Sequence, residues 1–114
     1  MVERREEQKL NLIFHALADG TRRSLLEKIK SEPVRVTTLA QDYPVSLNAI
    51  SKHLKVLEKA GLIQRSIEGR VHLCVANPEE LESAKGWIKE YTDFWNDKLN
   101  NLERYISKKQ KDKK

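Results

Sequence analysis

The sequence has few of the residues that interrupt helices or cross-link chains: 4 glycines, 3 prolines and 1 cysteine among 114 residues. Because Cys74 alone cannot build an internal disulfide framework, we expect a reducing, cytoplasmic location. No stretch approaches the ~20 consecutive apolar residues of a membrane span, and residues 1–9 lack the apolar run of a secretory signal. With 34% charged and 39% hydrophobic residues, the composition favours one helix-rich soluble domain.

The net charge is +5, and it is concentrated in two places. Basic residues outnumber acidic ones by 5 to 2 over residues 46–70, and by 5 to 1 over residues 108–114. Residues 71–107 are the reverse, with 7 acidic and 4 basic side chains. A basic central segment is what a polyanionic partner such as DNA requires, whereas a basic terminal segment alone is common and says little.

The apolar spacing and the capping residues predict five helices. Leu10 to Ala18 is apolar too densely for one stripe, so we expect a helix that is buried or lies at an interface. The other four predicted helices cover residues 22–30 with Thr21 as the cap, 36–41, 47–60 with Ser46 as the cap and Gly61 after the last turn, and 79–107. In the helix over residues 47–60, Ile50, Leu54 and Leu57 form the expected buried face.

A β-hairpin is expected between the last two helices. Leu62 to Ile67 and Val71 to Ala76 are short strand-like runs, and Glu68-Gly69 between them is typical of a turn. A short helix, a tight connection, a second helix with a polar outer face and a basic hairpin follow one another in the order of a winged helix-turn-helix. The expected fold class is therefore mainly α with a small β-hairpin wing.

Three segments of the sequence resemble the ArsR family of bacterial winged-helix repressors. They are HALADGTRRSLLEKI at residues 15–29, the stretch containing SKHLKVLEKAGL at residues 51–62, and NPEELESAKGWIKEYTDFWNDKLNNLERYI at residues 77–106. The family commonly has proline where this chain has Gly20. The resemblance covers roughly residues 10–106 and implies a homodimer that binds a palindromic operator and dimerises through its first and last helices.

The site residues carried over from this resemblance form two groups. The implied DNA contacts are Ser46, Asn48, Ser51, Lys52, His53 and Lys55 on the second helix, with Arg65 and Arg70 on the wing. The implied dimer contacts are Leu12, Ile13, Leu17, Trp87, Tyr91, Phe94, Trp95 and Leu102. The expected organisation is a flexible segment 1–9, a domain over residues 10–107 with a C-terminal dimerisation helix, and a basic disordered tail 108–114.

Metal sensing is not expected, because transition-metal sites need clustered nitrogen or sulfur ligands. The helix over 36–41 has no Cys or His, the last helix has none either, and the three histidines lie on separate elements. Cys74 is expected to be a buried, inert thiol rather than a redox switch.

Two predictions remain open between alternatives. His53 either contacts DNA or orients its helix. The aromatic side chains of residues 87–95 form either a dimer core or a pocket for an apolar effector.

The sequence thus predicts a dimeric, sequence-specific DNA-binding repressor without a cofactor. The alternative is a winged-helix module that binds another protein, but residues 46–55 lack the aromatic anchors typical of such surfaces. An enzyme is not expected, because the chain has no glycine-rich phosphate loop and no nucleophile motif.

Overall fold

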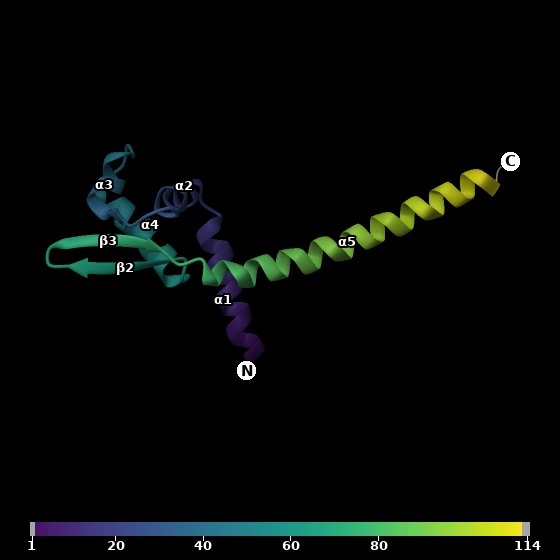
Figure 1. The fold of residues 1–114 in the computed structure, drawn as a ribbon, viewed down its shortest axis with the longest axis horizontal. Coiled ribbons are helices and arrows are strands. Elements are labelled where there is room, and N and C mark those ends of the chain that lie inside the picture. Colours follow the sequence, from purple (N-terminus) through teal and green to yellow (C-terminus); the bar gives the residue numbers. More distant parts are fainter. Residues whose placement is uncertain (1, 113–114) are drawn as a thin grey trace. The chain divides into compact units, whose positions relative to one another are not determined.

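The computed structural model describes residues 2–112, which divide between Ala84 and Lys85 into two compact units. The first unit contains helices α1 (Val2–Leu17), α2 (Gly20–Ile29), α3 (Val36–Gln41) and α4 (Leu47–Lys59), strands β1 (Val34–Arg35), β2 (Ile63–Glu68) and β3 (Val71–Ala76), and the start of α5 (Glu79–Asp112). The second unit is the remainder of α5. Figure 1 shows α2, α3 and α4 grouped beside the β2–β3 hairpin, which confirms the expected winged helix-turn-helix.

One hydrophobic core holds the first unit together, and each of its four complete helices contributes to it. The predicted buried face of α4 is confirmed, since Ile50, Leu54 and Leu57 have no exposed surface. Burying a side chain of this size contributes about 1.5–3 kcal/mol, so these three residues fix which side of α4 faces outward. The largest fully buried side chains of the core are Ile13, Leu25, Ile29, Leu39, Ile50, Leu54, Leu57, Leu62, Ile63 and Cys74.

Ile13 departs from the sequence prediction, which placed it in a dimer interface. Its side chain has no exposed surface and belongs to the core of this one chain. The reason is that α1 packs against both α2 and α4, so a residue on that side of the helix is covered within the subunit. Leu12 and Leu17 are half-buried and keep part of their surface free.

Two polar side chains set where the key helices begin. Ser46 caps α4 as predicted, because its hydroxyl accepts a hydrogen bond from the Ala49 N–H at 3.1 Å. The cap of α2 is Asp19 rather than the predicted Thr21, since the Asp19 carboxylate accepts from the N–H groups of Thr21 and Arg22. Asp19 has the extended backbone of an N-cap, and a carboxylate there also interacts favourably with the helix dipole.

The end of α4 and the turn of the hairpin both use glycine with positive φ. Gly61 has φ +77° after α4, and Gly69 has φ +62° in the hairpin. A β-carbon on Gly61 would lie 2.7 Å from Cγ of Glu80, so this position needs glycine for space as well as for conformation. Glu68 pairs with Val71, so the two-residue turn is Gly69-Arg70, one residue later than predicted.

The three strands form an antiparallel sheet in the order β1-β3-β2. β1, which the sequence did not reveal, pairs Val34 with Cys74 and Arg35 with Leu73. Arg65 lies opposite Cys74, and Ile63 lies opposite Ala76, so Arg65 shares the inner face of the sheet with core residues.

Both ends of the chain are more helical than the sequence predicted. α1 begins at Val2 instead of near Leu10, and α5 continues to Asp112 instead of ending near Ser107. Residues 2–9 and 108–112 lack an apolar stripe but are rich in good helix formers, which explains both the missed prediction and the helix. Met1, Lys113 and Lys114 lie outside the described residues. None of the helices within residues 2–112 is apolar enough over a sufficient length to cross a membrane.

Candidate nucleic-acid interface

The outer face of α4 carries a stripe of polar and cationic side chains. Asn48, Lys52 and Lys55 are exposed and lie at i, i+4 and i+7, opposite the buried face of the same helix. Ser46 is exposed at the cap, and no acidic residue occurs between Ser46 and Lys55. The stripe on the second helix of the helix-turn-helix therefore presents only neutral donors, acceptors and cations, the groups that meet base edges and phosphates.

The two remaining α4 residues from the sequence prediction are less accessible. Ser51 is half-buried and faces a cavity beside the hairpin. His53 is also half-buried, and its Nδ1 lies 3.3 Å from Nη1 of Arg22 on α2. Because a guanidinium can only donate, His53 Nδ1 must accept, which puts the proton of the neutral ring on Nε2. His53 thus has one nitrogen committed to positioning α4.

Arg22 joins three elements behind the exposed stripe and is 9% exposed. Its Nε donates to the Ala16 carbonyl at 2.8 Å, and its Nη2 donates to the His15 carbonyl at 2.9 Å. Together with the His53 contact, these bonds tie the end of α1 and the start of α2 to α4. The backbone N–H of Arg22 is also the main reason that the pKa of Asp19 is lowered, with smaller contributions from the Thr21 N–H and the Arg22 charge.

The two wing arginines occupy different positions. Arg70 is exposed in the hairpin turn, where a cation can reach an adjacent phosphate strand. The Arg65 side chain is only 19% exposed, and its Nε lies 3.0 Å from Oε2 of Glu58 on α4. Arg65 therefore holds the hairpin against the recognition helix instead of standing at its tip, and its burial reduces what it can offer DNA directly.

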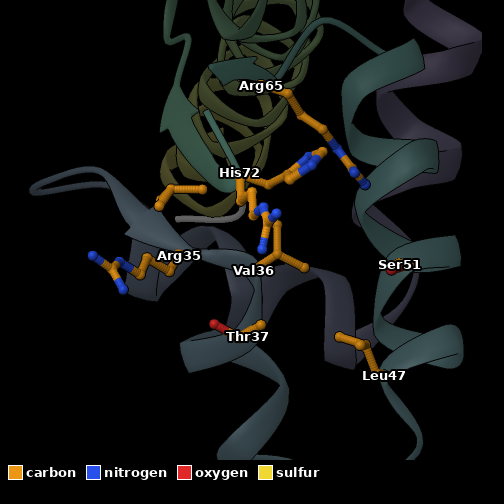
Figure 2. A pocket seen from close by; sticks show the side chains of 9 residues that line it. Arg35, Val36, Thr37, Leu47, Ser51, Arg65 and His72 are labelled. Carbon is orange, nitrogen blue, oxygen red and sulfur yellow. The ribbon is translucent and has the colours of Figure 1, made fainter. Parts of the chain in front are cut away.

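A cavity of about 340 Å³ lies where the hairpin, the start of α3 and the first half of α4 meet. Figure 2 shows Arg65 and His72 on the hairpin side, Leu47 and Ser51 on α4 across from them, and Thr37 at the start of α3. The cavity thus lies between the wing and the recognition helix, and Asn48, Lys52 and Lys55 are not among its lining residues.

Comparison with known proteins places this fold in a family. A helix-turn-helix domain family matches residues 17–65, which span α2 to the start of the hairpin. The uncharacterised helix-turn-helix regulator YuzN of Bacillus subtilis is 36% identical over 86 residues, covering 68% of this chain and 92% of YuzN. The crystal structure of the ArsR family transcriptional regulator RHA00566 is 34% identical, with a TM-score of 0.75 over 79% of this chain and 93% of that one. The chain belongs to the ArsR family of winged helix-turn-helix transcriptional regulators.

A second curated relative of this ArsR-family chain is more similar over a shorter segment. The helix-turn-helix regulator Rv2034 of Mycobacterium tuberculosis is 52% identical over 50 residues. That match covers 44% of this chain and 47% of Rv2034, so it spans about half the length of the relative.

Within residues 2–112, no group of three or more His, Cys, Asp or Glu side chains is placed to hold a metal ion. Cys74 has no exposed surface, as predicted, and burial raises the pKa of its thiol despite the opposing charge of Arg65. A buried, protonated thiol is a poor nucleophile and a poor redox sensor.

Sequence reasoning missed several residues of this face. Val45 and Leu47, which flank the cap of α4, are about half exposed although both are apolar. Apolar side chains at the start of a recognition helix are suited to contact thymine methyl groups. His72 and Thr37 were missed because they line the cavity only through the packing of the hairpin beside α3 and α4. Leu47 lies seven residues before Leu54, on the apolar side of the α4 pattern, and Val45 precedes the helix, so the sequence did not reveal that these two side chains are exposed.

Proposed function

We propose that this ArsR-family regulator is a homodimeric repressor that inserts α4 of each subunit into the major groove of a palindromic operator. The observation that carries the proposal is the α4 stripe, held outward by three fully buried residues and free of acidic groups. In this arrangement Arg70 approaches the neighbouring backbone from the hairpin turn. Half-sites one helical turn apart, about 34–36 Å, suit such a dimer.

The polar side chains have separate roles in this proposal. Asn48 is the candidate for base readout, because a carboxamide can pair with adenine through two hydrogen bonds. Ser46, Lys52 and Lys55 contact phosphates and set the register of the helix on DNA. Ser51 contributes from the cavity side, and His53 acts through its free Nε2 or by holding the helix against Arg22.

The dimer contact is proposed to involve α5 and the half-buried residues of α1, Leu12 and Leu17. Ile88, Tyr91, Trp95, Leu99 and Leu102 lie three or four residues apart, close to the spacing of a coiled-coil stripe. The rings of Trp87 and Tyr91 stack with centroids 5.4 Å apart, and Tyr91 meets Trp95 edge-on at 6.0 Å. Trp87, Phe94 and Trp95 are each about half exposed, so the stripe can bury substantial apolar area against a second copy.

A protein-binding role without DNA has no support from the exposed face of α4. Hot spots at protein interfaces are enriched in Trp, Tyr and Arg, whereas the α4 stripe consists of Asn48, Lys52 and Lys55. Family membership and the chemistry of the α4 surface therefore both favour DNA as the partner. A cytoplasmic location and the absence of enzymatic activity are part of this proposal.

The decisive experiment is fluorescence-anisotropy titration with DNA from just upstream of the gene that encodes this protein. A scrambled fragment of equal length serves as the control, and both are titrated at two salt concentrations. We expect tight binding to the native fragment that weakens steeply with salt, because each phosphate contact releases counterions. Equal, weak binding to both fragments would contradict a sequence-specific regulator.

Replacing Lys52 with alanine is expected to weaken binding to native and scrambled DNA by the same factor. The lost contact is to phosphate and carries no sequence information, so the salt slope should also fall by about 1. The matched control is Arg5→Ala, which removes the same charge from an exposed position on α1. Comparable losses in both variants would show that only net charge matters.

Replacing Asn48 with alanine is expected to weaken the native fragment selectively, by about 1–3 kcal/mol. Asn48 is exposed in the first turn of α4, the part of a recognition helix that contacts base edges. Anisotropy titration of both fragments measures the difference. A similar loss on scrambled DNA would remove Asn48 from base readout.

A further inference from the structure

The cavity between the hairpin and α4 has the chemistry of an anion site. Arg35, Arg65, Arg70 and His72 contribute to its walls, and no acidic side chain lines it among the described residues. Val36, Leu47 and Val71 supply the apolar part of the walls. The volume, about 340 Å³, lies within the range of small-molecule sites.

The sheet register explains why cations gather there. Arg65 and His72 stand on the same face of the hairpin as Ile63 and Cys74, which are buried in the core. The inner face of the hairpin is therefore apolar where helices cover it, and toward the turn it carries Arg65, His72 and the exposed Ile67. Figure 2 shows Arg65 and His72 directed from the hairpin toward α4, whereas the head group of Arg35 points away from it.

Much of the hydrogen-bonding capacity of Arg65 and Arg70 is not used within residues 2–112. Nε and Nη2 of Arg65 are both buried and neither makes a hydrogen bond among the described residues, although Nε lies 3.0 Å from Oε2 of Glu58. A buried donor left without an acceptor is costly. Arg70 likewise has no ion pair or hydrogen bond within residues 2–112. An oxyanion that binds in the cavity would give the exposed Arg70 guanidinium an acceptor.

We propose that this cavity binds a small organic oxyanion, a molecule that carries a phosphate or carboxylate group on a compact apolar body. Arg65, Arg70 and His72 hold the charged group, and Leu47 and Val71 contact the carbon part. Leu47 and Ser51 also belong to the recognition helix, and Arg70 belongs to the wing. A ligand here therefore competes with DNA, which would make it an inducer. The competition rests on the proposed DNA binding, but the anion binding does not.

The same groups could accept a DNA backbone phosphate, so the probes must separate the two sources. Phenyl phosphate tests the organic oxyanion, inorganic phosphate tests the charge alone, and the upstream DNA fragment tests the backbone. Each is titrated calorimetrically into the full chain in a phosphate-free buffer. The variants are Arg70→Gln and His72→Gln, and Arg5→Gln is the control that removes one charge outside the cavity.

We expect saturable binding of phenyl phosphate to the DNA-free protein, tighter than that of inorganic phosphate. The affinity should fall about tenfold or more in Arg70→Gln, because a charge-assisted hydrogen bond is lost, and should fall in His72→Gln as well. Arg5→Gln should bind like the parent chain. Added phenyl phosphate should also displace the upstream DNA fragment.

Three results would overturn the proposal. If Arg5→Gln lowers the affinity for phenyl phosphate as much as the cavity variants do, the binding is unspecific charge attraction. If phenyl phosphate and inorganic phosphate bind equally tightly, the cavity does not recognise an organic ligand. If the protein binds DNA but not phenyl phosphate, the cavity is a binding site for a DNA phosphate only, and the proposed function stands. Retained phenyl phosphate binding in a protein that ignores DNA would instead refute the proposed function and leave the anion site standing.

Discussion

Replacing Arg22 with methionine is expected to destabilise the protein by about 3 kcal/mol, since it removes several hydrogen bonds made by one buried charged group. The carbonyls of His15 and Ala16 each lose a donor, and Nδ1 of His53 loses its contact with the guanidinium. Methionine fills a similar space but offers no donor in return. Denaturant unfolding at a fixed protein concentration measures the loss.

The matched control is Arg23→Met on the same helix. Arg23 is exposed, and its Nη1 donates a hydrogen bond to the Leu17 carbonyl. Its replacement is expected to cost well under half as much, because an exposed carbonyl regains a hydrogen bond to water. If Arg22→Met and Arg23→Met are equally stable, the buried arginine does not hold the helices together.

The Arg22 variant also tests how the recognition helix is positioned. Because Arg22 reaches α4 through His53, its loss should weaken DNA binding under conditions where the variant is still folded. Arg22→Lys should restore only part of both properties, since a lysine cannot reproduce the planar fork that reaches three acceptors. His53→Ala, which keeps the bonds to His15 and Ala16, should lower stability less than Arg22→Met.

Local signals allowed the recognition helix to be predicted in detail. The Ser46 cap, the i, i+4, i+7 spacing of Ile50, Leu54 and Leu57, and the glycine at position 61 all lie within one segment of chain. Each is a short-range requirement of helix geometry, so a single sequence contains it. Once the buried face of α4 was predicted, its exposed face followed from helix geometry.

Features that depend on distant partners could not be predicted in this way. In the sequence, Arg22 looks like any charged residue of a helix. Its contact with His53, 31 positions later on α4, depends on how the helices pack and could not be predicted. β1 has only two residues, and it is a strand because β3 pairs with it. Arg65 was predicted as a DNA contact on the wing, but its side chain lies against Glu58. That position depends on the sheet register, which the turn, one residue later than predicted, determines.

The prediction with the largest expected effect concerns assembly: Trp95→Ala should shift the protein from dimer to monomer. Trp95 is about half exposed within one chain and lies in the middle of the apolar stripe of α5. In a symmetric dimer one substitution removes the side chain from both subunits. At about 2 kcal/mol per buried tryptophan, the loss is about 4 kcal/mol, or roughly a thousandfold in the dimer dissociation constant.

Sedimentation velocity over a range of concentrations measures this shift, and Asn100→Ala is its control. Asn100 is an exposed neutral residue on the opposite side of α5 from the stripe, so its loss should leave the dimer intact. DNA binding should weaken together with dimerisation in Trp95→Ala, because a monomer binds only one half-site. In the dimer, binding of one subunit gives the other a high effective concentration at the second half-site. A Trp95→Ala protein that sediments as the parent dimer would remove this residue from the interface.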